Sequence, residues 1–148
     1  MAHYVDTIDT LWSPEAAFAY MADARNFAEW DPGVRSSTLV RGEEPGPGAA
    51  FDVVVNAGPR TMTLTYETVE WESPRRLVLR AETRSIRSDD SVRIEATDTG
   101  CAVTYDAELD LRGVLRLFDP LLGLSFRKIG DRAAGGLRKV LEGPSRAS

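Results

Sequence analysis

Few side chains in this sequence have the chemistry of a general base, a nucleophile or a metal ligand. His3 is the one histidine and Cys101 the one cysteine, and the two lie far apart in the chain. Neither a Cys–His pair nor a His-rich metal site follows from this spacing. His3 is more typical of an exposed terminal residue than of a general base, and Cys101 is typical of a small buried hydrophobic residue. The sequence therefore predicts no metal site, no bound cofactor and no internal disulfide.

Two tyrosines remain as candidates for contact with a ligand. Tyr66 and Tyr105 fall on the apolar sides of strand-like segments, and a buried phenol usually finds a hydrogen-bond partner. Ser36 and Thr38 alternate with Arg35, so we expect their hydroxyls to face the same space as the tyrosines. We expect the tyrosines to orient a ligand rather than to transfer protons.

The remaining polar motifs have ordinary structural explanations. Asp106 and Glu108 fall on the polar side of their segment, so they are predicted to be solvated surface charges. The turn Gly46-Pro47-Gly48 lacks the glycine spacing and the following helix of a phosphate-binding loop. It is therefore predicted to connect two strands.

Seven segments show the apolar and polar alternation of β-strands: residues 3–11, 34–40, 51–56, 62–71, 77–84, 91–97 and 101–111. Turn residues separate them, among them the Ser-Asp-Asp run at 88–90. Short connections between consecutive strands are typical of an antiparallel meander with one apolar face and one charged face. Val69 and Trp71 break the alternation of their segment, which a β-bulge would explain.

Two short helices are predicted between the first and second strands. Ser13 can cap a helix whose first residue is Pro14. Asp23 can cap a second, brief helix that carries Phe27 and Trp30.

A long amphipathic helix is predicted over residues 113–141, and its apolar stripe needs a sheet to pack against. Pro120 leaves two interpretations open. The helix begins near Pro120, or the interruption marks a flexible lid over a cavity. Gly130, Gly135 and Gly136 lower the helix propensity further, which close packing would explain.

The composition is that of one ordinary globular domain. The chain has 148 residues, of which 43% are hydrophobic and 28% are charged, and we expect one domain over residues 1–142 and a flexible tail over 143–148. The formal charge of −5 argues against a nucleic-acid partner. No apolar run approaches the roughly 20 residues of a membrane span. Asp6 and Asp9 interrupt the segment where a signal peptide would be apolar, so we expect a cytoplasmic protein. Lys128 and Lys139 are the only lysines, and this preference for arginine, with many Ala, Gly and Pro, is typical of a GC-rich bacterial genome.

In combination, these segments resemble the START-like, polyketide cyclase/dehydrase and lipid transport superfamily (SRPBCC). The resemblance rests on residues 13–15, 23–34 and 69–77, on the Pro-Gly turn before Phe51 and on the long C-terminal helix. It covers residues 1–142. It implies an α+β helix-grip fold, in which a curved antiparallel sheet of about seven strands wraps around the C-terminal helix, with two short helices between strands 1 and 2.

The resemblance also implies a ligand cavity between the sheet and the long helix. The residues expected to line it are Phe27, Trp30, Ser36, Thr38, Phe51, Val53, Met62, Leu64, Tyr66, Leu79, Ile94, Tyr105, Phe118, Leu122 and Phe126. Each apolar member of this set is equally typical of a packed core.

Three functions remain open at this point. The first is the binding or transport of a small hydrophobic ligand, such as a lipid or a polyketide. The second is a polyketide cyclase or aromatase-like enzyme that uses Tyr66, Tyr105 and Arg127, because Arg127 borders the apolar stripe of the long helix. The third is a partner-binding module.

Overall fold

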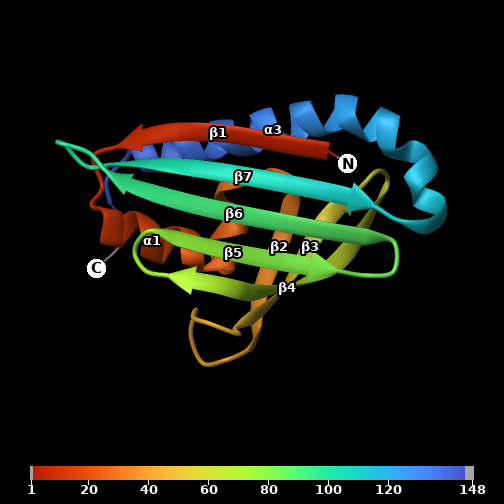
Figure 1. Cartoon of the computed structure of the whole chain (residues 1–148), viewed down its shortest axis with the longest axis horizontal. Helices are drawn as coiled ribbons and strands as arrows, with labels where there is room; N and C mark the ends of the chain where they lie inside the picture. Colours follow the sequence, from red (N-terminus) through yellow and green to blue (C-terminus); the bar gives the residue numbers. More distant parts are fainter. Residues whose placement is uncertain (1, 146–148) are drawn as a thin grey trace.

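The computed structural model of the chain describes residues 2–145, except for the side chains of residue 114 and residues 118–124. Seven strands form one antiparallel sheet in the order β1-β7-β6-β5-β4-β3-β2. Their bounds are β1 Ala2–Thr10, β2 Val34–Arg41, β3 Ala50–Ala57, β4 Arg60–Glu72, β5 Arg76–Glu82, β6 Ile86–Ala96 and β7 Cys101–Leu111. Strands β2 and β3 run at a steep angle to β5, β6 and β7 (Figure 1), so the sheet is strongly curved. The predicted α+β class and the meander are confirmed.

The short helices between β1 and β2 begin after the predicted capping residues Ser13 and Asp23. The helices are α1 Pro14–Ala22, the 3-10 helix η1 Ala24–Asn26, α2 Phe27–Trp30, the 3-10 helix η2 Gly113–Phe118 and α3 Asp119–Glu142. The Ser13 hydroxyl accepts a hydrogen bond from the Ala16 N–H at 3.1 Å, and the Asp23 carboxylate accepts one from the Arg25 N–H at 3.1 Å. The long helix begins at Asp119. This agrees with the first interpretation of Pro120, in which the helix begins near that residue.

The sequence prediction was wrong about the start of β6. The run Ser88-Asp89-Asp90, which the sequence predicted as a turn, lies inside β6, and the turn is formed by residues 83–85. Aspartate is disfavoured in strands, but here β6 is paired on both sides: Asp90 lies opposite Leu79 of β5 and Ala107 of β7. Strand pairing therefore overrides the local preference, and an acidic side chain enters the apolar face of the sheet.

Register shifts in β4 and β2 change which side chains face inward. The register shift between Thr68 and Glu70 in β4 confirms the bulge predicted from the broken alternation. Two shifts in β2, between Val34 and Ser36 and between Leu39 and Arg41, were not predicted. A slip of one residue moves every following side chain to the other face. As a consequence Ser36 and Thr38 are exposed, which corrects their predicted inward placement.

The long helix α3 runs along the sheet beside β1 (Figure 1). Ala133, Leu137 and Leu141 of α3 are at most 2% exposed and pack into the main hydrophobic core. The stripe predicted from the sequence is therefore buried over the second half of the helix. Leu115 lies in η2, before this helix begins.

The C-terminal end of α3 is tied to the end of β1 by side-chain hydrogen bonds. The Thr10 hydroxyl donates to the Leu141 carbonyl at 2.5 Å and accepts from the Trp12 N–H at 3.1 Å. The Trp12 indole N–H donates to the Gly143 carbonyl at 2.8 Å. Carbonyls in the last turn of a helix have no partner within the helix. The side chains of Thr10 and Trp12 therefore supply hydrogen-bond donors at the end of α3. Gly143 was predicted to belong to a flexible tail; residues 146–148 of that tail lie outside the described residues.

We expect Thr10→Val to destabilise the protein by about 1–3 kcal/mol, because it preserves shape and removes a buried donor and acceptor together. Thr10 is 5% exposed. The matched control is Thr7→Val in the same strand, where an exposed hydroxyl pairs with Thr104 at 3.0 Å; we expect a change within about 0.5 kcal/mol. Urea unfolding of both variants measures the difference. Equal effects of the two substitutions would show that the buried hydrogen bonds add nothing.

Candidate functional site

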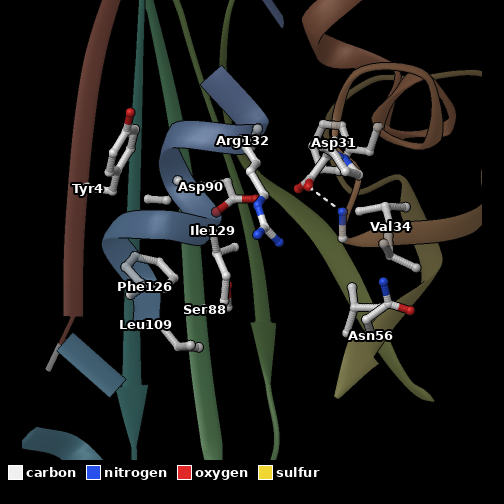
Figure 2. Close-up of a pocket in the computed structure, with 18 of the residues that line it drawn as sticks. Tyr4, Asp31, Val34, Asn56, Ser88, Asp90, Leu109, Phe126, Ile129 and Arg132 are labelled. Atoms are coloured by element: carbon white, nitrogen blue, oxygen red, sulfur yellow. Dashed lines mark hydrogen bonds between the residues drawn. The ribbon is translucent and has the colours of Figure 1, made fainter. Parts of the chain in front are cut away.

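A pocket of about 310 Å³ lies between the inner face of the sheet and α3. Its walls come from β1, β3, β4, β6, β7 and α3, with α2, the segment that joins α2 to β2 and the start of β2 at one side (Figure 2). Ligand pockets in proteins have volumes of roughly 300–1,000 Å³ and mostly apolar walls with a few polar groups. This pocket is at the lower end of that range.

Six of the residues predicted to line a cavity do line this pocket. They are Phe27, Val53, Leu64, Tyr66, Tyr105 and Phe126. Four others are buried in the core beside it and do not line it: Trp30, Phe51, Leu79 and Ile94. Met62 is half-buried and packs against the core.

The other predicted site residues lie elsewhere. Ser36 and Thr38 are exposed on β2, and Arg127 is exposed on α3 and does not line the pocket. The side chains of Phe118 and Leu122 lie outside the described residues. The arginine that does line the pocket is Arg132, one turn and a half further along α3.

Tyr66 is fixed in place by a polar partner on the inner face. Its hydroxyl is 2.7 Å from the Ser88 hydroxyl, and both residues are buried and line the pocket. Burial raises the pKa of Tyr66 strongly, and the negative charge of Asp90 adds to the shift. Burial likewise raises the pKa of Tyr105, again with Asp90 as the next cause. Both phenols therefore stay protonated and can donate a hydrogen bond to a ligand.

Asp90 is the most unusual residue of the pocket, and the sequence interpretation missed it. Its side chain reaches into the pocket from β6 (Figure 2), and the residue is 8% exposed. Burial raises the pKa of Asp90 from 3.8 to about 7, with further increases from the charges of Asp31, Asp89 and Asp106. Among the described residues, none donates a hydrogen bond to this carboxyl group or forms an ion pair with it. Asp90 is thus a carboxyl group that titrates near neutral pH inside an apolar pocket.

Asp31 is the second carboxyl group of the pocket. It follows α2, and its own N–H bonds to the Phe27 carbonyl at 2.9 Å, as expected of a residue that ends a helix. Its side chain accepts the Gly33 N–H at 2.8 Å and lines the pocket (Figure 2). Burial raises the pKa of Asp31, and the bond from Gly33 opposes that shift.

The sequence held a signal for Asp90 and Ser88 but not for Asp31. Ile94 was predicted to face the cavity, and the same alternation continued backwards through Val92 places Asp90 and Ser88 on that face. Because residues 88–90 were predicted to form a turn, the alternation was not extended to Asp90 and Ser88. Asp31 lies in a loop, where no periodicity indicates the direction of a side chain.

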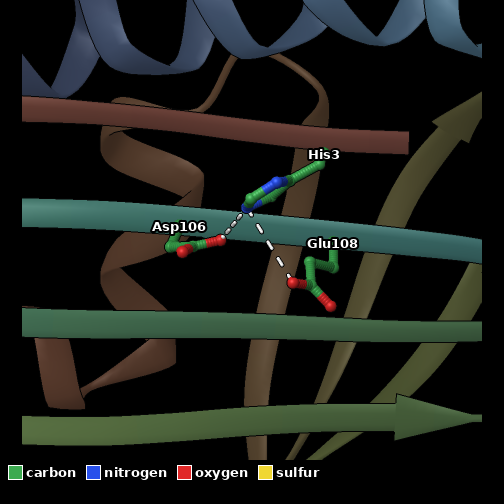
Figure 3. Close-up of side chains that lie close together, drawn as sticks. All are labelled: His3, Asp106 and Glu108. Carbon is green, nitrogen blue, oxygen red and sulfur yellow. Dashed lines mark hydrogen bonds and ion pairs between the residues drawn. The ribbon is translucent and has the colours of Figure 1, made fainter. Parts of the chain in front are cut away.

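Cys101 and His3, the one cysteine and the one histidine of the sequence, do not line the pocket. Cys101 is fully buried in the core, and burial raises the pKa of its thiol. His3 lies on the outer face of the sheet, where its Nε2 is 2.6 Å from an Asp106 oxygen and 3.9 Å from a Glu108 oxygen (Figure 3). These three residues offer ligand atoms within 4.8 Å of one another, but they are open to solvent, and such exposed groups are common without a bound ion.

An apolar pocket between a curved antiparallel sheet and a long C-terminal helix is the arrangement of a helix-grip fold. The family described as "Polyketide cyclase / dehydrase and lipid transport" matches residues 1–142. The chain belongs to this family.

Relatives and solved structures agree with this assignment at the level of the fold. An uncharacterised protein of Mycobacterium tuberculosis is 27% identical over 131 residues, which cover 83% of this chain and 77% of that protein. A START superfamily protein from Mycobacterium smegmatis superposes with a TM-score of 0.72 at 10% identity, covering 95% of this chain and 97% of the other. The Zhui aromatase/cyclase from Streptomyces has a TM-score of 0.68 at 14% identity, covering 93% and 88%. At these identities the two structures show a shared fold. Within the described residues, no helix is long and apolar enough to cross a membrane.

Proposed function

We propose that the protein binds a small hydrophobic ligand, such as a lipid or a polyketide, in the pocket between the sheet and α3. The observation that carries the proposal is the space itself: about 310 Å³ lined mainly by apolar side chains. Protein interiors are otherwise close-packed, so a space of this size needs an occupant or a reason to stay open. The family description, which names lipid transport, supports the same role.

Filling the pocket with a larger side chain is expected to weaken ligand binding. Ala107 lies on the inner face of β7 and lines the pocket, whereas Ala102 lies on the outer face of the same strand. We expect Ala107→Phe to weaken the binding of N-phenylnaphthylamine, an uncharged fluorescent probe, by at least about tenfold, since a fully buried ring occupies the space the probe needs. Ala102→Phe should leave the affinity unchanged. Fluorescence titration gives both affinities.

Native mass spectrometry of the purified protein, followed by solvent extraction, identifies a natural ligand directly. A stoichiometric lipid or polyketide-like molecule in the wild type, absent from Ala107→Phe, is the expected result. A ligand-free mass together with no binding of the probe to the wild type would contradict the proposal.

A second candidate function is a cyclase-like enzyme, and one observation favours it. General acid–base catalysis works best with a group whose pKa lies near the working pH, and the pKa of Asp90, about 7, meets that condition. Asp90 shares the pocket with the phenols of Tyr66 and Tyr105. Turnover of a candidate polyketide by the wild type, lost in Asp90→Asn and retained in Asp89→Asn, would favour the enzyme over the carrier.

A further inference from the structure

The polar end of the pocket has an excess of negative charge. Asp90 and Asp31 both line it, and the negative charge of Asp31 raises the pKa of Asp90. Asp31 has one backbone donor, from Gly33, and Asp90 has no hydrogen-bond donor among the described residues. A buried carboxylate without a partner is costly. The folded protein therefore retains an unfavourable arrangement that a suitable ligand would relieve.

We propose that the ligand is an apolar molecule with a protonated amine, and that the carboxylates of Asp90 and Asp31 hold this amine inside the pocket. The inference rests on the proposed function, since it names the class of ligand for the same site. An ammonium group supplies both a positive charge and several N–H donors. It can satisfy two carboxylates that form no ion pair with any arginine or lysine among the described residues.

The cations of the protein do not perform this role. Arg132 lines the pocket from α3, and Figure 2 shows its side chain among the pocket residues. Arg132 is nevertheless exposed to solvent. Among the described residues, no arginine or lysine forms an ion pair with Asp90 or Asp31. By contrast, Asp89, the outward-facing neighbour of Asp90, is paired with two arginines, Arg80 and Arg87. Asp89 on the outer face thus has two cationic partners, whereas no arginine or lysine of the described residues forms an ion pair with the two carboxylates of the pocket.

The walls of the pocket suit a cation as well. Phe27, Tyr66, Tyr105 and Phe126 all line it. The faces of aromatic rings attract ammonium groups, by about 0.5–2 kcal/mol depending on exposure. The aromatic and aliphatic walls also bind the apolar part of the molecule.

The same charges select against the other ligand types. A fatty acid or another anion would place a third negative charge beside Asp90 and Asp31, which like-charge repulsion opposes. An uncharged alcohol or hydrocarbon leaves at least one carboxyl group without a cation. The pocket is therefore expected to rank amines above alcohols and alcohols above carboxylates of the same hydrocarbon length.

Binding of an amine should depend on pH through Asp90. The titratable or charged groups around Asp90 come from the segment after α2, from β4, β6 and β7 and from α3: Asp31, Tyr66, Asp89, Tyr105, Asp106 and Arg132. The pKa of Asp90 in the free protein is about 7, whereas an alkylamine, like lysine, stays protonated to about pH 10. The affinity for an amine should therefore rise from pH 5.5 to 7 as Asp90 ionises and level off above pH 8. Amine binding near pH 7 should also release a proton.

The experiment compares octylamine, octanol and octanoate by isothermal titration calorimetry at pH 7.5. We expect octylamine to bind the wild type at least tenfold more tightly than octanol, and octanoate to bind most weakly. Asp90→Asn should bring the amine-to-alcohol ratio close to one, and Asp31→Asn should lower it. Asp89→Asn is the matched control one residue away on the outer face, and it should keep the wild-type ratio. Titrations in two buffers with different ionisation enthalpies measure the released proton.

The outcomes separate this inference from the proposed function. Equal binding of octylamine and octanol, or tighter binding of octanoate, would overturn the amine inference and leave a hydrophobic binding protein. Failure of all three ligands and of N-phenylnaphthylamine would overturn the proposed function itself. An amine preference that persists in Asp90→Asn and Asp31→Asn would place the amine site elsewhere and likewise overturn the inference.

Discussion

Replacing Gly136 by alanine should destabilise the protein by about 3 kcal/mol, because α3 and α2 touch backbone to backbone at this point. A Cβ atom at Gly136 would lie 1.9 Å from the Trp30 carbonyl oxygen and 2.9 Å from its carbonyl carbon. Backbone atoms cannot rotate away as the end of a side chain can, so α3 would have to move. Overpacking of this kind costs typically 1–3 kcal/mol and occasionally more. The movement would also displace Trp30, whose ring lies against Tyr105 at a centroid distance of 5.4 Å.

The adjacent residue, Gly135, is the matched control. A Cβ atom there would meet nothing within 4 Å. Alanine is a better helix former than glycine by up to about 1 kcal/mol, so we expect Gly135→Ala to stabilise the protein slightly. Urea unfolding of the two variants should thus give effects of opposite sign. Similar effects would mean that the approach of α3 to Trp30 is looser than the structure indicates.

The fold could be predicted because its determinants are local and repeat along the chain. Alternation of apolar and polar residues gives strands with one buried face, and the caps at Ser13 and Asp23 give the short helices. The glycines of the long helix are explained only by tertiary contacts. Gly130 meets the ring of Tyr4, and Gly136 meets the backbone of Trp30. The sequence predicted close packing at these glycines but did not identify the residues that contact them.

The site could be predicted only in part, because its decisive residues depend on strand register and on the path of a loop. The aromatic residues of the pocket could be predicted from the alternation of side chains along the strands: Tyr66 and Tyr105 lie on the inner face as expected. Ser36 was placed on the wrong face because one bulge in β2 reverses the parity after it. Asp90 was not predicted as a pocket residue because a run of Ser and Asp is typical of a turn. Only its pairing with β5 and β7 keeps it in a strand. Ser88 and Asp90 violate the local strand preference and line the pocket, as expected of residues of a functional site.

Replacing Asp90 by asparagine should stabilise the protein, and by an amount that grows with pH. The pKa of Asp90 is raised in the folded state, from 3.8 to about 7, so the folded protein holds this proton more tightly than the unfolded chain does. Stability is therefore greatest below pH 4 as far as this group is concerned, and it falls as the pH rises through the window from about 4 to 7. The fall is at most about 1.4 kcal/mol per pH unit, or about 4 kcal/mol over the whole window.

Asparagine has nearly the shape of aspartate and cannot ionise. The stability of Asp90→Asn therefore does not fall through ionisation of residue 90 as the pH rises. Urea unfolding between pH 4 and pH 8.5 should show variant and wild type nearly equal at pH 4, diverging up to about pH 7 and parallel above it. Asp89→Asn, which removes the ion pairs with Arg80 and Arg87, should instead leave stability unchanged or lower it by up to about 1 kcal/mol. A difference between Asp90→Asn and wild type that stays constant with pH would contradict the raised pKa. A gain at neutral pH would show that the free protein keeps Asp90 at the expense of stability, as expected if a ligand satisfies that carboxylate.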